Sequence, residues 1–324
     1  MKRFLLWLLA ILVVVVMGIV LAFRFSPWPS VAVIQYVFAK SDRASAAALA
    51  RHVPPGITAK LDISYGTGPD ERLDVFHRED ATGPQPTVVW VHGGGFVAGS
   101  KEAVANYLKV IADAGYTVVN VGYSTGFGSV YPRPIEQLNT ALAYVEAHAV
   151  EHNIDSQRLV LAGSSAGAQI AAQTALLITD ADYAGKMEIL PMVDPAQLRG
   201  AVLVSGAFDM ESARTDSWLV NAVLWAYTGV RDFMNDPRFM LASIPQNVTP
   251  GFPPAFITSG NGDPLLNHAE ALVSALEAAG VPTDVLFFPA DYEPPLPHEF
   301  QFNLDIPAGQ EALARMLAFL RSRA

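Results

Sequence analysis

The residues Gly163-Ser164-Ser165-Ala166-Gly167 predict more about this chain than any other stretch of it. They form a Gly-x-Ser-x-Gly motif, in which the flanking glycines allow a tight, strained turn around a central serine. An apolar run at 158–162 precedes the motif, and a helical pattern begins at Ala166. The sequence therefore predicts a strand, a sharp turn and a helix, with Ser165 rather than its neighbour Ser164 as a nucleophile at the helix N-terminus.

A second motif, His92-Gly93-Gly94-Gly95-Phe96, follows another strand-like run at 87–91. Glycines directly after a strand leave backbone N–H groups free to point at an oxygen that becomes negatively charged during a reaction. We expect the N–H groups of Gly94, Gly95 and Ala166 to form such an oxyanion hole, and the His92 side chain to hold the glycine loop. Each motif alone can arise by chance, but both together, in this order, predict a hydrolase.

A serine nucleophile needs a general base, for which histidine is the usual residue. Only His268 and His298 lie downstream of Ser165. His268 falls near the start of a helical pattern at 267–279, where a polar surface residue is ordinary. His298 follows the last strand-like run, in a loop that should reach the carboxyl edge of a parallel sheet, so we predict His298 as the base.

The base in turn needs an acidic partner, and four aspartates are candidates. Asp263 lies between a strand-like run and a helical pattern, at the expected active-site edge. Asp284 begins a strand at the opposite edge, and Asp291 lies off the expected strand. Asp209 follows the preceding strand and is the main rival, with helix capping or loop stabilisation as its alternative role. The sequence favours Asp263.

Strand-like and helical patterns alternate along most of the chain. Segments at 60–65 and 72–77 alternate polar and apolar residues around Gly66-Thr67-Gly68-Pro69-Asp70, which predicts a hairpin. Apolar strand-like runs follow at 87–91, 117–121, 158–162, 201–204, 255–258 and 284–288, and helical patterns at 103–114, 135–148, 166–178, 267–279 and 310–321. This alternation predicts an α/β fold with a doubly wound, mostly parallel, eight-stranded sheet.

The interval 209–254 is longer than one crossover helix needs. Insertions at the carboxyl edge of a parallel sheet face the crevice where ligands bind, so this interval predicts a small cap over the site. Together with Phe96, four of its aromatic residues are expected to line a substrate pocket: Trp218, Trp225, Tyr227 and Phe233. The alternative is that these aromatic side chains belong to the core and that the site is open.

The N-terminal residues 4–23 form an uncharged apolar run. Twenty helical residues span about 30 Å, the thickness of the hydrocarbon core of a bilayer. We favour a retained single-pass anchor over 1–25, because the run is longer than the core of a signal peptide. Secretion after cleavage is the alternative, although the small residues Ser30-Val31-Ala32 lie late for a cleavage site.

The anchor prediction divides the chain into three parts. Residues 1–25 form the transmembrane helix, residues 26–59 a connecting segment with an Ala-rich helix near 45–50, and residues 60–324 the catalytic domain. Lys2 and Arg3 precede the apolar run and Arg24, Lys40 and Arg43 follow it, so the basic residues near its two ends are almost equal in number. The short positive tail favours an extracytoplasmic or periplasmic catalytic domain, and the near-equal counts leave the opposite orientation open.

Composition excludes several kinds of site and partner. The chain has 324 residues, of which 51% are hydrophobic, enough for one large domain. A formal net charge of −10, without a Lys/Arg-rich run, argues against a nucleic-acid partner. The sequence contains no cysteine, which excludes thiol catalysis, disulfides and cysteine-ligated zinc. No clustering of metal-ligand residues is visible in the sequence, so we expect neither a metal nor another cofactor.

The chain resembles the hormone-sensitive-lipase-like branch of the α/β-hydrolases, which includes acetyl esterases and carboxylesterases. The resemblance covers roughly 60–323 and rests on the two glycine motifs, on Asp263-Pro264-Leu265 and on His298-Glu299-Phe300. It implies a cofactor-free esterase for short-chain or aryl esters, with Ser165, Asp263 and His298 as its triad. The chain departs from the family where Gly122-Tyr123-Ser124 replaces Asp-Tyr-Arg, and where extra prolines precede the histidine: Pro294, Pro295 and Pro297.

These observations predict a membrane-anchored serine carboxylesterase that acts on a small-molecule ester through an acyl-enzyme. An amide hydrolase of the arylformamidase or peptidase kind would use the same triad and is the first alternative. A catalytically inactive, membrane-tethered interaction protein is the second, and the complete set of serine, aspartate and histidine argues against it. The sequence makes no prediction about the oligomeric state.

Overall fold

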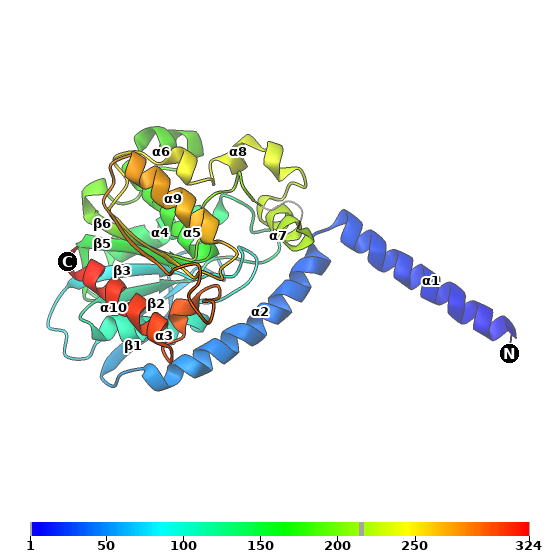
Figure 1. The fold of residues 1–324 in the computed structure, drawn as a ribbon, viewed down its shortest axis with the longest axis horizontal. Coiled ribbons are helices and arrows are strands. Elements are labelled where there is room, and N and C mark those ends of the chain that lie inside the picture. The colour runs from blue at the N-terminus through cyan, green and yellow to red at the C-terminus, as the bar shows by residue number, and fades with distance from the viewer. Residues whose placement is uncertain (1, 214–216, 324) are drawn as a thin grey trace.

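The computed structural model describes residues 2–213 and 217–323, which contain a central eight-stranded sheet (Figure 1). The strands follow the spatial order β1-β2-β4-β3-β5-β6-β7-β8. β2 pairs antiparallel with β1 and β4, and all other neighbours are parallel. The predicted doubly wound, mostly parallel sheet is confirmed. The strands are β1 (Ile57–Ser64), β2 (Arg72–Arg78), β3 (Gln85–Val91), β4 (Thr117–Val121), β5 (Ile154–Ser164), β6 (Leu198–Val204), β7 (Ala255–Ser259) and β8 (Thr283–Phe287).

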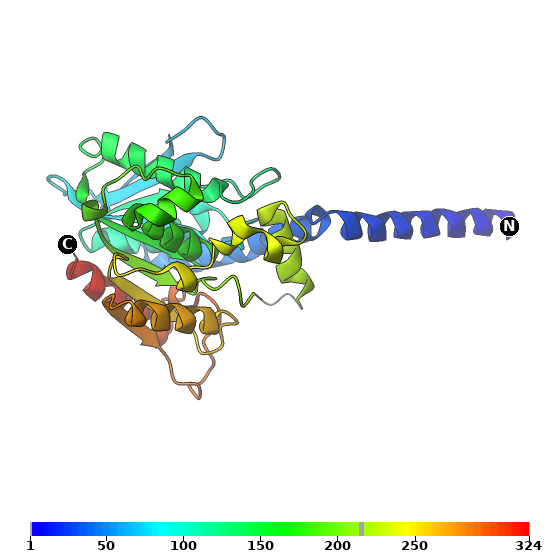
Figure 2. The ribbon, with the colours of Figure 1, turned by 90° about the horizontal axis from the view of Figure 1, so that it is seen from above.

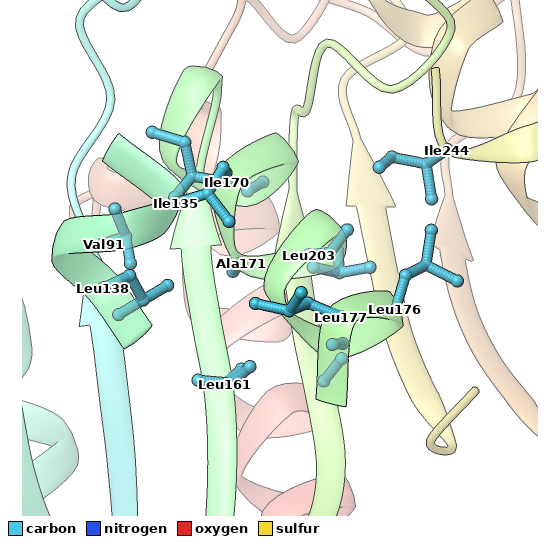
Figure 3. Packing of buried hydrophobic residues seen from close by; sticks show 14 of the residues in the cluster. Val91, Ile135, Leu138, Leu161, Ile170, Ala171, Leu176, Leu177, Leu203 and Ile244 are labelled. Carbon is cyan, nitrogen blue, oxygen red and sulfur yellow. The ribbon is translucent and has the colours of Figure 1, made fainter. Parts of the chain in front are cut away.

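Helices cover both faces of the sheet, because successive side chains of its buried strands point to opposite faces. On β3, Val89 and Val91 pack in the same cluster as α4, α5 and α9, whereas Val88 and Trp90 pack with α3 and α10. Figure 3 shows α5 lying over the strands on the first of these faces. The helices are α1 (Lys2–Phe25), α2 (Trp28–Leu49), α3 (Lys101–Asp113), α4 (Arg133–Ala147), α5 (Ala166–Thr179), α6 (Ala181–Met187), α7 (Trp218–Thr228), α8 (Pro237–Met240), α9 (Leu266–Ala278) and α10 (Pro307–Arg321).

α1 extends away from the rest of the molecule as a single helix whose side chains are exposed (Figure 2). Within the described residues it is the one helix long and apolar enough to cross a membrane. Its 24 residues correspond to about 36 Å, more than the hydrocarbon thickness of a bilayer. Both a membrane anchor and a signal sequence fit these properties.

α2 occupies most of the segment 26–59, in which the sequence predicted a helix only near 45–50. α2 begins at Trp28, and the neighbouring Pro27 and Pro29 lie at its N-terminus, where proline initiates a helix rather than breaking it. The buried side chains of Val31 and Ile34 pack against the segment that follows the glycine loop. β1 then begins at residue 57, so the expected domain boundary at 60 falls inside a strand.

The interval between β6 and β7 contains α7, α8 and two short 3-10 turns, Phe233–Asn235 and Pro245–Asn247. Residues 214–216, which belong to the expected cap at 209–254, lie outside the described residues. α7 packs beside α2 in a small hydrophobic cluster. The inserted segment and α2 therefore meet, and residues of both lie next to Ser165 at the carboxyl end of β5.

Candidate active site

Ser165 lies at a sharp turn between β5 and α5. Its backbone angles, φ 53° and ψ −123°, are strained for a non-glycine residue, at a cost of about 1–3 kcal/mol. A Cβ atom on Gly163 would lie 2.5 Å from the backbone of Gly167, and one on Gly167 would lie 2.2 Å from the carbonyl oxygen of Val91. Both glycines are therefore needed for the turn, which leaves Ser165 partly exposed while Ser164 is buried.

His298 and Asp263 lie beside Ser165, although the three residues are far apart in the sequence. His298 Nε2 is 3.0 Å from Ser165 Oγ, and His298 Nδ1 is 2.9 Å from Asp263 Oδ1. Because an ionised carboxylate only accepts hydrogen bonds, Nδ1 carries a proton and the lone pair of Nε2 points at the serine hydroxyl. Such an arrangement can move a proton from a serine hydroxyl to an imidazole.

Burial and neighbouring charges shift the pKa values of His298 and Asp263 in opposite directions. Burial disfavours the charged form of His298, but the hydrogen bond to Asp263 and the charges of Glu299 and Asp263 outweigh it and raise the pKa of His298 above 6.5. Burial also disfavours the charged form of Asp263, yet hydrogen bonds from His298 and from the N–H of Leu265 lower the pKa of that carboxyl. Asp263 is therefore ionised at neutral pH, and His298 is a stronger base than a free imidazole.

Asn261, which the sequence analysis did not single out, ties together the two loops that carry these residues. Its side-chain amide donates to the carbonyl oxygen of Tyr292 at 2.9 Å, and its side-chain oxygen accepts from the N–H of Leu296 at 2.8 Å. A Cβ atom on Gly260 would lie 2.2 Å from the Leu296 carbonyl oxygen, so the loops touch. The proline-rich segment before His298 is thereby fixed to its neighbour. The Gly-Asn-Gly sequence after a strand was the signal that could have indicated this role.

The glycine loop lies next to Ser165 and requires its glycines. Gly94 and Gly95 have φ values of 124° and 60°, and a Cβ atom on Gly94 would lie 2.0 Å from the carbonyl oxygen of Ala98. Gly95 lines the same cavity as Ser165 and Ala166. As the first residue of α5, Ala166 has a backbone N–H without an intrahelical partner. Two of the three expected donors, Gly95 and Ala166, thus line the cavity beside Ser165, and Gly94 precedes Gly95 in the loop.

His92 supports this loop rather than facing the cavity. Its Nδ1 donates to the carbonyl oxygen of Gly93 at 2.7 Å, and its ring stacks on Tyr123 with centroids 4.4 Å apart. The Tyr123 hydroxyl donates to the backbone carbonyl of His92 at 3.1 Å. Burial lowers the pKa of His92 to about 4, so the imidazole is neutral with its tautomer fixed by the loop. This is the structural role expected for it.

The rival acid and base lie in other contacts. The Asp209 carboxylate accepts from the N–H groups of Glu211 and Ser212 and from the Ser243 hydroxyl, which stabilises its own loop. The expected surface position of His268 is wrong: the residue is 6% exposed and lines the cavity. Its Nδ1 accepts the backbone N–H of Asp209 at 3.1 Å, because the first turn of α9 faces inward.

A cavity of about 450 Å³ lies over Ser165. Most of its lining is apolar, with the serine and a histidine at one side, which is the usual form of a small-molecule site. The sequence did not predict the contribution of α2, because it indicated only a connecting segment at 26–59. The apolar side chains that line the cavity include Ile34 and Phe38 of α2, Phe96 of the glycine loop, Leu219, Val220 and Val223 of α7, and Leu265.

Of the five residues expected to bind substrate, only Phe96 lines this cavity. Tyr227 is fully buried behind it, with its ring stacked on Phe96 at 4.1 Å. Phe233 is buried within the insertion, Trp225 is half-buried, and Trp218 is 64% exposed. α7 turns its smaller aliphatic side chains toward the cavity, since residues three and four apart share one face of a helix. The four aromatic residues that the sequence predicted from the interval 209–254 therefore lie outside the lining of the pocket.

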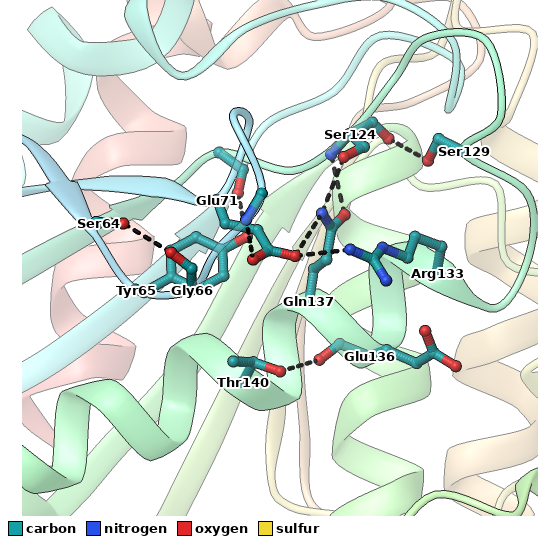
Figure 4. A network of polar contacts seen from close by, with 12 residues as sticks. Ser64, Tyr65, Gly66, Glu71, Ser124, Ser129, Arg133, Glu136, Gln137 and Thr140 are labelled. Atoms are coloured by element: carbon teal, nitrogen blue, oxygen red, sulfur yellow. Dashed lines mark hydrogen bonds and ion pairs between the residues drawn. The ribbon is translucent and has the colours of Figure 1, made fainter.

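The segment Gly122-Tyr123-Ser124 is held by a partly buried polar network (Figure 4). Gln137 accepts from the Ser124 N–H at 3.0 Å and donates to Glu71 at 3.3 Å, and Arg133 donates to the same carboxylate at 2.8 Å. A Cβ atom on Gly122 would lie 2.9 Å from the carbonyl oxygen of Arg72. This backbone therefore favours glycine at position 122.

Comparison with known proteins gives one family. A sequence model described as the alpha/beta hydrolase fold matches residues 88–300, a range that includes both glycine motifs, Asp263 and His298. An acetyl esterase of Salmonella paratyphi B is 29% identical over 216 residues, which cover 64% of this chain and 65% of the relative. A carboxylesterase of Mycobacterium tuberculosis is 31% identical over 242 residues, 73% of each protein.

The match spans slightly less than two thirds of the length of the acetyl esterases. Among solved structures, esterase B of Lactobacillus rhamnosis has a TM-score of 0.79 at 20% identity, covering 91% of this chain and 95% of its own. A bacterial heroin esterase has a TM-score of 0.70 at 25% identity, covering 88% and 90%. The similarity to esterase B of Lactobacillus rhamnosis shows that the two proteins share a fold.

Proposed function

Because the chain belongs to the α/β-hydrolase fold family, we propose that it is a serine carboxylesterase for short-chain or aryl carboxylic esters. The acetyl esterase and carboxylesterase among its relatives support an ester as the substrate. One observation carries the proposal: hydrogen bonds of 2.9 and 3.0 Å run from Asp263 through His298 to Ser165, at the side of an apolar cavity.

In the proposed reaction, Ser165 Oγ attacks the carbonyl carbon of the ester while its proton passes to His298 Nε2. The ionised Asp263 stabilises the imidazolium that forms and keeps the ring oriented through Nδ1. His298 then gives the proton to the departing alcohol, which leaves Ser165 acylated. A water molecule attacks the acyl-enzyme by the same proton transfers and releases the carboxylic acid.

The negative charge that develops on the carbonyl oxygen needs hydrogen-bond donors. We assign this role to the N–H groups of Gly94, Gly95 and Ala166. Each such donor contributes about 3 kcal/mol of transition-state stabilisation, because it is oriented before the reaction begins. The N-terminus of α5 adds a favourable field at the same point.

The proposed cap consists of the interval 209–254, and α2 supplies the facing wall. An enclosed apolar pocket favours a short acyl group, with each buried CH₂ contributing about 0.8 kcal/mol until the pocket is full. Beyond that length, overpacking reverses the gain. We therefore expect p-nitrophenyl acetate to hexanoate to be turned over best, and long-chain triglyceride emulsions poorly.

We also assign α1 as a retained membrane anchor, with the catalytic domain outside the cytoplasm. Lys2 and Arg3 give the short tail the charge that favours the cytoplasmic side. Cleavage after Ala32 would cut α2 near its start and remove Val31, whose side chain is fully buried in the cluster with Val97. The packing of α2 therefore supports retention over cleavage.

The proposal is tested by the turnover of p-nitrophenyl esters from two to sixteen acyl carbons and of the matching p-nitroanilides. The expected result is a maximum in kcat/KM at or below six acyl carbons, with the anilides slower than the esters. A kcat/KM that still rises at twelve carbons would contradict the closed pocket and indicate a lipase. Faster anilide cleavage would assign the site to an amide hydrolase.

A further inference from the structure

We infer that the active-site cavity opens at the membrane surface and receives amphiphilic esters, with a short acyl group and a longer apolar alcohol, from the bilayer interface. This inference rests on the proposed esterase function and on α1 as an anchor. Beyond the proposed function, we infer that the substrate is dissolved in the bilayer and that it enters the site from the membrane surface.

α2 connects the anchor directly to the wall of the cavity. α1 ends at Phe25 and α2 begins at Trp28, and the N–H of Ser26 still bonds to the carbonyl of Ala22 at 3.0 Å across the junction. Ile34 lines the cavity. At 1.5 Å per helical residue, Ile34 lies only about 14 Å along the chain from the end of α1. The polar layer of a bilayer adds roughly 5–8 Å beyond the hydrocarbon core, so the cavity begins close to that layer.

The opposite wall of the cavity lies at the same end of the molecule. α1 leaves the molecule next to α7 in both views (Figures 1 and 2). Val223 of α7 packs against the cluster that holds Val31 and Ile34, and Val223 also lines the cavity. Both helical walls therefore meet where the anchor ends.

This end of the molecule carries large apolar side chains, which we call the apolar rim: the exposed Phe127, Trp218 and Leu219, and the half-buried Trp28. Phe127 is 84% exposed, and its ring contacts that of Trp28 with centroids 4.9 Å apart. Leu219 is both exposed and part of the cavity lining, so the rim reaches the mouth of the site. Exposed apolar patches beside a binding site mark a contact surface, and tryptophan is enriched where proteins meet the bilayer interface.

The bilayer explains this rim better than a protein partner does. The rim continues from a helix that is exposed along its whole length and is apolar enough to span a membrane. The formal net charge of −10 disfavours attraction to anionic head groups, so contact through apolar and aromatic side chains is the remaining mode. A substrate that concentrates at the interface would then reach Ser165 without crossing bulk water.

The test uses the full chain in phosphatidylcholine vesicles and two butyrate esters. p-Nitrophenyl butyrate is presented from water, and dodecyl butyrate is dissolved in the bilayer, so the transferred acyl group is the same. The rim variant Phe127→Ser/Trp218→Ser changes two exposed residues outside the cavity lining. The matched control Val150→Ser/Leu190→Ser changes two residues that are 87% and 83% exposed and lie outside both rim and cavity lining.

The rim variant should hydrolyse dodecyl butyrate at about one fifth of the wild-type rate or slower, because interfacial contact is weakened. Its rate on p-nitrophenyl butyrate should stay within about twofold of the wild type. The control variant should keep both rates. Equal losses on both esters, or no loss on either, would overturn bilayer entry. A rim variant that changes oligomeric state in size-exclusion chromatography would assign the rim to a second copy instead. A wild type that hydrolyses neither ester would contradict the proposed function itself.

Discussion

Two histidines lie at the cavity, and their hydrogen bonds distinguish them. His298 bridges Ser165 and Asp263, whereas His268 accepts only a backbone N–H in the described structure. His298→Ala should lower kcat by several orders of magnitude, because the members of a triad act as a unit. His268→Ala should cost less than about tenfold, through lost packing rather than lost proton transfer. Steady-state kinetics on p-nitrophenyl butyrate, with the unfolding midpoint of each variant, would measure both. An inactive His268→Ala enzyme beside an active His298→Ala enzyme would reverse the assignment.

The pH dependence of kcat/KM reports the same imidazole. His298 must be neutral to accept a proton, and its pKa is raised above 6.5, so activity should increase with pH through a midpoint above 6.5. The carboxylate of Glu299 helps to raise that pKa, so Glu299→Gln should move the midpoint to lower pH. Glu293→Gln, which changes an exposed residue earlier in the loop, is the matched control and should leave the midpoint in place. A Glu299→Gln midpoint that stays or rises would show that another group controls the profile.

The sequence predicted Ser165, His298 and Asp263 because each follows a strand that ends at the same edge of a parallel sheet, and the structure brings the three side chains together. The sequence could not place residues whose role depends on side-chain direction. Trp218 and Tyr227 were expected in the pocket, yet α7 turns smaller side chains toward the cavity. His268 was expected at the surface, because a helical pattern alone does not reveal which face of the first turn is buried.

At the scale of elements, the strands of the sheet were predictable and α2 was not. Alternating strand and helix patterns specify a parallel sheet, and the structure differs from them only by a few residues at most ends. The sequence predicted a helix in this segment only near 45–50, whereas α2 begins at Trp28, with prolines in its first turn, where they fit a helix. Its buried face, with Val31 and Ile34, matches a partner surface that the sequence alone does not reveal.

α2 should help to set the acyl-chain limit. Phe38 lines the cavity, so Phe38→Ala should enlarge it and move the maximum of kcat/KM to longer acyl chains, with about a fourfold gain for each extra methylene accommodated. Val33→Ala, on the exposed face of the same helix, is the control and should leave the chain-length profile unchanged. An acyl series of p-nitrophenyl esters measures both variants. A profile that Phe38→Ala does not change would mean that the acyl group lies elsewhere.

At the scale of the whole molecule, α1 and the catalytic domain should be separable. Deleting residues 1–24 should give a soluble enzyme that keeps its activity on p-nitrophenyl butyrate, because α1 contributes nothing to the cavity lining. Deleting 1–52 should abolish activity and lower the unfolding midpoint, since it removes Ile34 and Phe38 from the site. Fractionation and carbonate extraction of the full chain measure the anchor. A mature N-terminus near Val33 would show a cleaved signal instead.

The most direct test of the central claim is labelling of the full chain with a fluorophosphonate, followed by mapping of the adduct by mass spectrometry. The adduct should lie on Ser165 alone, the nucleophile that His298 activates at 3.0 Å. Folded Ser165→Ala protein should not be labelled, whereas Ser164→Ala, which changes the buried neighbour, should be labelled like the wild type if its fold is intact. An adduct on Ser164 or on any other residue, or a labelled Ser165→Ala protein, would contradict the claim that Ser165 is the catalytic nucleophile.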